Sequence, residues 1–297
     1  MANYIVNNVY VADGVNDLYY HDGSGSYTNA DQEAGDYSYR YSGANPNNYV
    51  CFGIDLVGCT KDNLYRIVGV FNGQVKLIKY DYANSNLLGT NSGYIGDYGV
   101  LGSSYKGNKS TIDSYYWGTT SINLWDVSAL NGALNRNYLN NIGSKWSDMI
   151  ATTSWKVGGI AMSDINDIVV SDTIKLVYQN EILNSAENTT YSAKMGLMYV
   201  SDYGYAASPK NWKTSLYDYF NIAYNDNWMY MGLYEWTITR RSNNANCVFQ
   251  LNSTGNVLVT AANAKIGVGG VRPVFYLNSD VIYVSGSGTQ TDPYRIA

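Results

Sequence analysis

The feature of this sequence that most constrains its fold is a β-hairpin signal centred on residues 72–73. Two runs rich in β-forming residues, LYRIVGVF over 64–71 and QVKLIKY over 74–80, flank the dipeptide Asn72-Gly73. An Asn-Gly pair between two such runs is typical of a tight two-residue turn, because both turn positions need positive φ angles. The chain must therefore fold around at least one antiparallel pair of strands.

A second group of strand signals fills the last third of the chain. From Trp228 onward, LYEWTITR, CVFQLN, NVLVTA and GVRPVFYL follow one another at the spacings of a small antiparallel sheet, which we expect over residues 228–277. Ser253-Thr254-Gly255 supplies one of the turns. Residues 278–297 then predict a β-hairpin tail, in which Pro293 suits an edge strand.

Helical signals lie in the middle of the chain. Ser128 is the expected N-cap of one helix, in which Leu130, Leu134 and Tyr138 recur at helical spacing and which Gly143 ends. Shorter helical stretches are expected over 145–151 and 209–220, and strands over 154–162 and 194–201. Helices followed by a clustered antiparallel sheet predict the α+β fold class.

The remaining segments are expected to lie outside this framework. Residues 1–48 are predicted to be a polar N-terminal arm, because residues 13–48 are rich in glycine and polar side chains and lack apolar periodicity. Residues 49–277 are predicted to form one domain, with polar surface insertions at 83–120 and 163–190. The predicted organisation is therefore an arm, one domain and the hairpin tail.

Composition excludes several classes of function. Only 14% of the residues are charged, the net charge is −5 and no basic run occurs, so neither a nucleic-acid interface nor a polybasic membrane anchor is expected. The single histidine, His21, argues against histidine-rich metal sites and histidine-dependent catalytic triads. No stretch reaches the ~18 apolar residues of a membrane helix. We expect no enzymatic activity, no cofactor, no metal and no direct membrane insertion.

The same composition predicts an exported protein. Low charge combined with 31 tyrosines and abundant asparagine, glycine and serine is typical of exported surface proteins. Residues 1–10 lack the basic and apolar regions of an export signal. We therefore expect an extracellular or cell-surface protein, or one carried on a phage particle, whose export signal or anchor is absent from the given sequence.

The cysteines fit this expectation. Cys51 and Cys59 enclose a short segment with Gly53 and Gly58 just inside it, so a disulfide would close a small loop and stabilise the fold by roughly 2–3 kcal/mol. The alternative is two buried thiols on neighbouring strands, because spacing alone does not determine geometry. In either case Cys247 has no partner in the sequence pattern.

Two short motifs carry a resemblance to a known fold. Glu235-Trp236-Thr237 is followed about 35 residues later by Gly270-Val271-Arg272-Pro273. This pairing resembles the C-type-lectin-like fold in its formylglycine-generating-enzyme-like branch, which the variable proteins of diversity-generating retroelements also use. NNYVCFG, LYRIVGVF, GLMYVSDYGYAAS and EWTITR resemble paralogous surface proteins of gut Bacillota, and the likeness covers most of residues 19–297. In such a fold we expect Arg272 to form a structural ion pair with Glu235, and Trp236 to lie in the core.

The resemblance also implies a binding face between the two motifs. In retroelement-diversified proteins this region carries the variable positions, and here residues 241–263 alternate apolar Phe249, Leu251 and Val257 with polar residues, as a strand with one buried face does. The many asparagines resemble a little-altered template, or they reflect the abundance of asparagine throughout the chain. The candidate ligand-binding residues are Trp212, Trp228, Tyr230, Arg241, Asn243, Asn244, Asn246, Cys247, Gln250, Asn252, Asn256, Thr260 and Asn263, with Tyr217 as a further aromatic anchor.

The sequence therefore favours a surface-displayed or phage-associated ligand-binding protein of adhesin or receptor-binding type, whose partner is a protein or a glycan. One alternative is a calcium-independent lectin-like module that stacks sugars on Trp212 or Trp228. The other is an oxidoreductase related to formylglycine-generating enzymes. We disfavour it because those enzymes bind copper through paired cysteines, and only Cys247 lies in the corresponding half of the chain.

Overall fold

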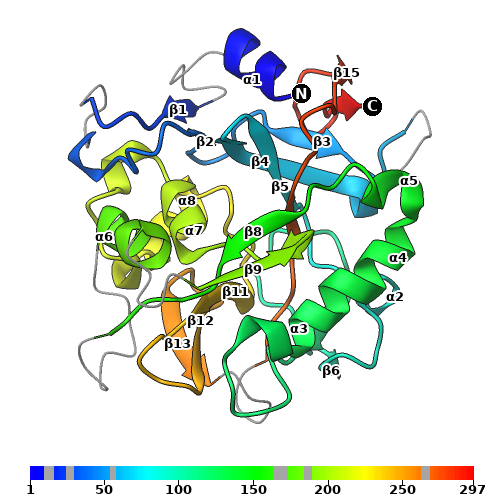
Figure 1. The fold of residues 1–297 in the computed structure, drawn as a ribbon, viewed down its shortest axis with the longest axis vertical. Helices are drawn as coiled ribbons and strands as arrows, with labels where there is room; N and C mark the ends of the chain where they lie inside the picture. The colour runs from blue at the N-terminus through cyan, green and yellow to red at the C-terminus, as the bar shows by residue number, and fades with distance from the viewer. Residues whose placement is uncertain (10–16, 25–29, 54–57, 163–172, 184–188, 262–267) are drawn as a thin grey trace.

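The predicted hairpin forms the centre of the largest sheet. The computed structural model describes residues 1–9, 17–24, 30–53, 58–162, 173–183, 189–261 and 268–297 (Figure 1). Strands β4 (Leu64–Phe71) and β5 (Gln74–Lys79) pair antiparallel around Asn72 and Gly73, whose φ angles are +49° and +76°. Both angles are positive, so the Asn-Gly turn is confirmed.

The hairpin pairs with strands that precede it and with strands that follow it in the sequence. The seven-stranded sheet has the order β1-β2-β4-β5-β14-β10, and β3 also pairs with β4. The added strands are β1 (Leu18–Tyr20), β2 (Tyr39–Tyr41), β3 (Tyr49–Cys51), β10 (Met195–Gly196) and β14 (Val274–Tyr276). Because β1 and β2 belong to this sheet, the prediction of a separate arm over residues 1–48 is wrong.

The predicted late sheet is confirmed for three strands and wrong for the fourth. Strands β11 (Glu235–Arg240), β12 (Cys247–Leu251) and β13 (Val257–Ala261) form an antiparallel sheet of their own. Strand β14, by contrast, pairs with β5, and residues 228–234 are not a strand. Spacing along the chain predicts that strands exist, but the partner of each strand depends on contacts between distant residues.

The other strands form three two-stranded pairs. These are β6 (Tyr94–Asp97) with β7 (Asp113–Tyr115), β8 (Thr153–Lys156) with β9 (Thr190–Ala193), and β15 (Tyr283–Ser285) with β16 (Arg295–Ile296). The last pair confirms the hairpin predicted for the tail. The predicted strand over 154–162 ends at Lys156, and the one over 194–201 is only β10.

Eight short α-helices complete the described part of the chain. They are α1 (Ala2–Asn8), α2 (Ser85–Leu88), α3 (Ala129–Gly132), α4 (Leu139–Ile142), α5 (Ser144–Ser147), α6 (Ile174–Tyr178), α7 (Val200–Tyr205) and α8 (Phe220–Asp226). A π-helical stretch over Ala133–Tyr138 joins α3 to α4. The protein is thus a mixed α+β fold. None of the helices in these ranges has the length and apolar character needed to cross a bilayer.

The helix predicted after Ser128 is confirmed. Ser128 Oγ accepts a hydrogen bond from the main-chain N–H of Asn131 at 3.0 Å, and the helix ends at Gly143, whose φ is +83°. The prediction over 209–220 is wrong in its bounds. Pro209–Asn211 and Leu216–Asp218 form single 3₁₀ turns, and the α-helix starts only at Phe220.

The two predicted insertions contribute to the core. Tyr115 and Trp117 are buried, and Trp117 Nε1 donates to the main-chain oxygen of Thr237 in β11 at 2.9 Å. In 163–190, residues 163–172 and 184–188 lie outside the described residues, but α6 buries Val177 and Tyr178. The buried Tyr115 and Trp117 lie in a segment without apolar periodicity, whereas the buried residues of α6 recur at helical spacing.

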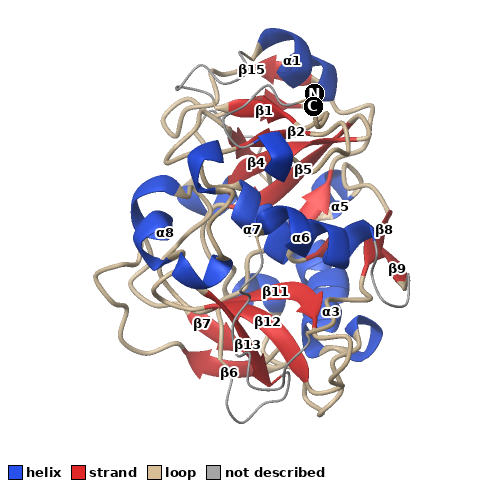
Figure 2. Cartoon of the chain, turned by 90° about the vertical axis from the view of Figure 1, so that its left-hand side faces the viewer, coloured by secondary structure: helices blue, strands red, loops and turns tan. Residues whose placement is uncertain are grey.

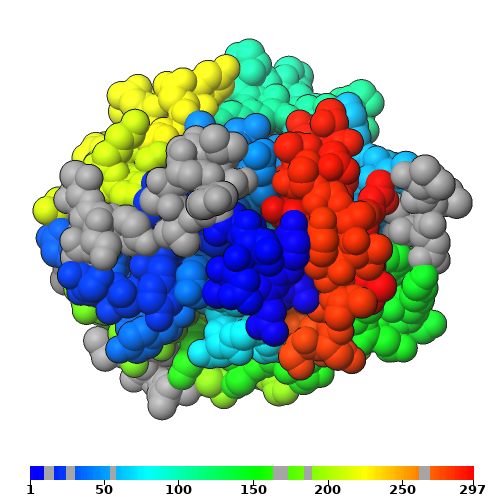
Figure 3. Space-filling view, turned by 90° about the horizontal axis from the view of Figure 1, so that it is seen from above, coloured from blue at the N-terminus to red at the C-terminus, as the bar shows by residue number. Residues whose placement is uncertain are grey.

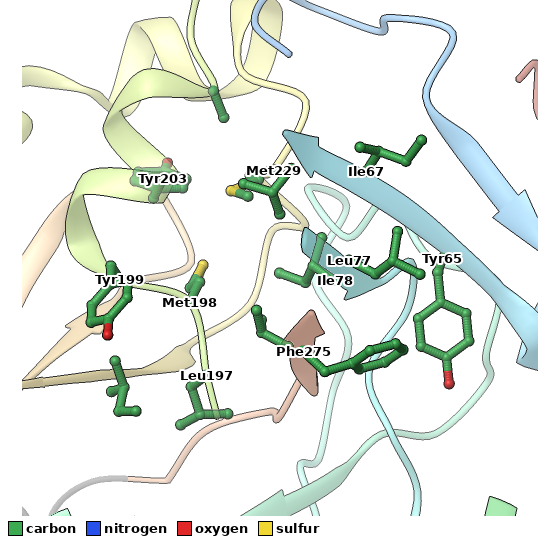
Figure 4. Close-up of a cluster of buried hydrophobic side chains, with 14 of the residues drawn as sticks. Tyr65, Ile67, Leu77, Ile78, Leu197, Met198, Tyr199, Tyr203, Met229 and Phe275 are labelled. Carbon is green, nitrogen blue, oxygen red and sulfur yellow. The ribbon is translucent and has the colours of Figure 1, made fainter. Parts of the chain in front are cut away.

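The main core lies between the large sheet and the segments around α7. Figure 4 shows Ile78 of β5 pointing toward the layer that contains Met198, Tyr199, Tyr203 and Met229. All five side chains are buried. The two layers therefore share one continuous core, which holds α7 in a fixed position against the sheet.

Helix α1 packs on the C-terminal hairpin. The Met1 ammonium group donates to the main-chain oxygen of Val281, and the ring of Tyr4 stacks on Tyr283 with centroids 3.6 Å apart. Figure 3 shows α1 lying against the C-terminal segment on the surface of the molecule. The two chain ends thus form one shared structural unit.

Cys51 and Cys59 are joined by a disulfide, and Cys247 is a free, half-buried thiol. If the protein is made in an oxidising compartment, alkylation of the unfolded chain without reductant should modify one thiol, as counted by intact mass. The variant Cys247→Ser should then show no modified thiol. Three modified thiols in the wild-type protein would contradict the exported state.

Candidate functional site

The two motifs that carry the resemblance meet in the core. Arg272 Nε lies 2.7 Å from Glu235 Oε1, both side chains are 1% exposed, and Arg272 Nη2 donates to the main-chain oxygen of Met229 at 2.6 Å. Burial raises the pKa of Glu235, and the charge of Arg272 opposes this rise. Trp236 is buried, and its Nε1 donates to Tyr115 O at 2.7 Å. The predicted ion pair between Arg272 and Glu235 and the predicted burial of Trp236 are confirmed.

Five of the predicted ligand-binding residues are buried, and their assignment to an exposed face is wrong. These are Trp212, Trp228, Tyr230, Arg241 and Gln250. Trp212 Nε1 donates to Ala207 O at 2.8 Å, and Trp228 Nε1 donates to Tyr41 O at 2.8 Å. These indole rings fill the core and hold main-chain segments together, so they offer no surface for stacking a sugar.

Gln250 is buried because β12 is covered on both faces. It lies in the central strand of its sheet, and its Nε2 donates to the main-chain oxygen of Val268 at 3.0 Å. Strand alternation correctly places Phe249 and Leu251 in the core. However, alternation cannot show that residues 268–270 cover the opposite face.

The other predicted residues lie at or near the surface. Asn243 and Asn246 are exposed, whereas Asn244, Cys247, Asn252, Asn256 and Thr260 are partly exposed. Asn263 lies outside the described residues. Phe249, Leu251 and Val257 are buried, as predicted for the face beneath. The exposed part of the predicted binding face is therefore smaller than predicted. It consists mainly of the loop between β11 and β12 and the loop between β12 and β13.

Several of these asparagines shape the loops in which they lie. Asn252 Oδ1 accepts hydrogen bonds from the main-chain N–H groups of Thr254 at 3.0 Å and Asn256 at 2.9 Å. Asn244 Oδ1 likewise accepts from Asn246 N at 2.9 Å. Such Asx turns are a common structural use of asparagine. Part of the asparagine density in this region therefore has a structural explanation.

Asn123, which lies outside the predicted binding region over 241–263, holds the loop between β11 and β12 in place. Asn123 is buried, and its Nδ2 lies 3.0 Å from Arg241 O, 2.7 Å from Asn244 O and 2.6 Å from Cys247 O. These carbonyl groups belong to the turn that connects β11 to β12. The β11–β12 loop is thus held by Asn123, a residue far away in the sequence, so this role is visible only in the structure.

Three exposed aromatic side chains lie beside the second loop. Tyr217, Phe220 and Tyr224 are 51%, 51% and 55% exposed, and their spacing places them along one side of α8 and the turn before it. We call these three residues the α8 ridge. Sequence reasoning named Tyr217 but missed Phe220 and Tyr224, although their i, i+4 spacing was a usable signal.

The α8 ridge adjoins the β11–β12–β13 sheet. The turn over Leu216–Asp218 contacts β13, and Ala223 of α8 packs against Gly255 in the β12–β13 turn. Figure 2 shows α8 above this sheet. Helix α8 and the turn before it, which carry the ridge, therefore pack directly on the β12–β13 part of this sheet.

The environment of the free Cys247 thiol disfavours the thiolate form that a reactive cysteine needs. Burial raises the pKa of Cys247, and Arg241 opposes that rise only in part. A nucleophilic or metal-binding cysteine needs a lowered pKa, because the thiolate is the reactive form.

No family model matches this chain, and no curated protein or solved structure is significantly similar to it.

Proposed function

We propose that this chain is a non-catalytic ligand-binding protein with a C-type-lectin-like fold, displayed on a cell surface or a phage particle. The proposed partner is a protein or a glycan on another surface. The buried Glu235–Arg272 pair lies at the positions that the resemblance implies, which supports the fold assignment. The disulfide supports the proposed location outside the cell.

One observation carries the binding role. The α8 ridge exposes three large aromatic side chains on a helix whose Ala223 packs against Gly255 of the β12–β13 turn. Aromatic residues are enriched at binding hot spots because they bury a large area at a low cost in side-chain entropy. A soluble protein that exposes clustered rings in this way presents a surface suited to a partner. We therefore place the binding face here and not at Trp212 or Trp228.

The experiment replaces the ridge and leaves the core intact. The triple variant Tyr217→Ser, Phe220→Ser, Tyr224→Ser should weaken binding to cells or to a glycan array at least about tenfold, because each hot-spot aromatic residue contributes ~1–2 kcal/mol. The free energy of unfolding should change by only about 0.5 kcal/mol per site. Binding is measured by surface capture and stability by urea denaturation.

Two control variants make the result specific. Tyr37→Ser removes another exposed tyrosine, 70% exposed, and should leave binding unchanged. Phe249→Ala removes a buried ring and serves as the reference for loss of the fold. If the ridge variant binds as tightly as the wild-type protein, or unfolds as readily as Phe249→Ala, the α8 ridge is not the binding face.

A further inference from the structure

The single histidine of the chain, His21, is buried where segments distant in the sequence meet. It follows β1 at the edge of the large sheet, and its main-chain groups pair with Tyr37 and Ser38, just before β2. Its ring is 0% exposed and packs against the rings of Tyr205 in α7 and of Trp212, with centroids 4.9 Å and 5.0 Å away. The imidazole ring therefore joins the edge of the sheet to the layer that contains α7.

The hydrogen bonding of this ring determines its protonation state. His21 Nδ1 accepts a hydrogen bond from the main-chain N–H of Ala34 at 3.1 Å. A nitrogen that accepts carries no proton, so the proton of the neutral imidazole is on Nε2. Nε2 is buried and makes no hydrogen bond to any described residue. A second proton must therefore go to Nδ1, where it would meet the N–H group of Ala34.

Ala34 belongs to the segment over residues 30–36, which includes one 3₁₀ turn and no strand. Contacts with side chains hold this segment against the fold. The Tyr205 hydroxyl donates to the main-chain oxygen of Gln32 at 2.8 Å, and Lys175 Nζ donates to that of Asp31 at 2.8 Å. Because no strand ladder secures the segment, the bond between Ala34 and His21 matters for keeping it in place.

The groups around the ring keep it neutral. Burial lowers the pKa of His21 well below its usual value, Arg40 of β2 lowers it further, and Asp36 opposes the shift. Burial raises the pKa of Asp36, but the charge of Arg40 outweighs burial and the pKa falls to about 2. Burial raises the pKa of Tyr205, which is therefore uncharged in acid, and Trp212 does not titrate. The closed fold thus keeps His21 neutral at a pH at which an exposed histidine is protonated.

We propose that His21 is a pH-sensitive switch, in which a proton on Nδ1 releases residues 30–36 from β1 and α7. The proton turns an acceptor into a donor, so the N–H of Ala34 loses its partner and faces another N–H. It also places a positive charge in a buried site near Arg40. Opening of the segment exposes the ring to water and removes both costs. The switch does not depend on the α8 ridge or on the proposed function.

The switch responds to acid and not to base. Above about pH 6.5 the ring is neutral in the closed and the open form, so the closed form has its full stability. Below that pH the open form binds a proton that the closed form lacks, and the population of the open form rises as the pH falls. With one proton bound on opening, the equilibrium constant for opening should rise about tenfold between pH 7.5 and 5.5.

Nuclear magnetic resonance of the full chain tests the closed form directly, because one histidine gives one set of imidazole signals. The ¹⁵N shifts should show the neutral ring with its proton on Nε2 at about pH 7.5. The signal of the folded protein should not titrate between about pH 7.5 and 5.5. A proton on Nδ1 at neutral pH, or a folded-state titration near pH 6.5, would overturn the proposal.

Hydrogen exchange of the Ala34 amide measures the opening. Its protection factor, taken relative to the intrinsic exchange rate at each pH, should fall about tenfold between pH 7.5 and 5.5. Ala34 should also be less protected than the amides that pair β4 with β5, because only a local opening is needed to expose it. Protection that does not change with pH, or that equals the protection of the β4–β5 hairpin, would contradict a local switch.

Three variants assign the effect to His21. His21→Asn offers an amide oxygen in place of Nδ1 and cannot titrate, so Ala34 should stay protected at pH 7.5 and lose the tenfold fall. His21→Phe keeps a ring but removes the acceptor, so Ala34 should be less protected at both pH values. Glu33→Gln is the control, because burial raises the pKa of Glu33, whose Oε2 accepts from Gly23 N at 2.7 Å; the fall should persist there. A fall that persists in His21→Asn, or that disappears in Glu33→Gln, would assign the pH dependence to another group.

Discussion

Replacing Arg272 with methionine is expected to lower the free energy of unfolding by about 3–5 kcal/mol at neutral pH. The substitution leaves the Glu235 carboxylate buried without its counter-charge, in a position that is 1% exposed. It also removes the hydrogen bond to the main-chain oxygen of Met229. Urea denaturation followed by tryptophan fluorescence measures the change, and a loss below about 1 kcal/mol would show that the pair is not a structural centre.

The same variant should show a distinctive pH dependence. Without Arg272, the buried Glu235 has a pKa above that of the unfolded chain, so the folded state binds the extra proton and becomes relatively more stable as the pH falls. The destabilisation should therefore be smaller at about pH 5 than at about pH 8. The double variant Glu235→Leu, Arg272→Met removes both charges and should regain much of the lost stability. A double variant as unstable as the single one would indicate a packing effect instead.

Raising the pH from about 7 to about 9 is expected to stabilise the fold through Lys79. This side chain is fully buried in β5, and its Nζ donates to the main-chain oxygen of Asp62. Burial lowers the pKa of Lys79 to about 7, and Lys109 lowers it too, whereas Asp62 and Asp81 oppose the shift. In the unfolded chain the pKa returns to about 10.4.

The sign of the effect follows from the bound protons. Between these two pKa values the unfolded chain holds a proton that the folded chain has lost, so the free energy of unfolding rises with pH, by at most about 1.4 kcal/mol per pH unit. Below about pH 7 both states carry the proton, and the full penalty of the buried charge is present. Lys79→Met should be more stable than the wild-type protein at about pH 6 and should lack this slope in urea denaturation. An equal slope in both proteins would assign the effect to other groups.

The features predicted correctly from the sequence are those with a local or closely spaced signal. The Asn72-Gly73 turn and the Ser128 cap depend on a few neighbouring residues. Cys51 and Cys59 lie eight residues apart, and the structure joins them. The Glu235–Arg272 pair spans 37 residues but was indicated by two recognisable motifs.

The binding surfaces were harder to predict, because exposure depends on what packs above a residue. Trp212 and Trp228 are of the residue type that often anchors a ligand, yet the segments packed around them bury both side chains. Lys76 and Asp202 lie 126 residues apart, so nothing in their surroundings along the chain indicates their buried ion pair. Phe220 and Tyr224 form the exception, since their helical spacing among polar neighbours marks an exposed aromatic stripe.

The contact between α1 and the C-terminal hairpin determines the orientation in which the protein can be attached to a support through its chain ends. Both chain ends lie at the top of Figure 1, whereas β12 and β13 lie at the bottom. A peptide tag, a linker or a surface support joined to either chain end would therefore attach the molecule on the same side. The opposite side, which carries β12 and β13, would then face the solution. Because the two ends are neighbours, a short peptide could also join them, and new ends could be opened in an exposed loop without separating the strands of the large sheet.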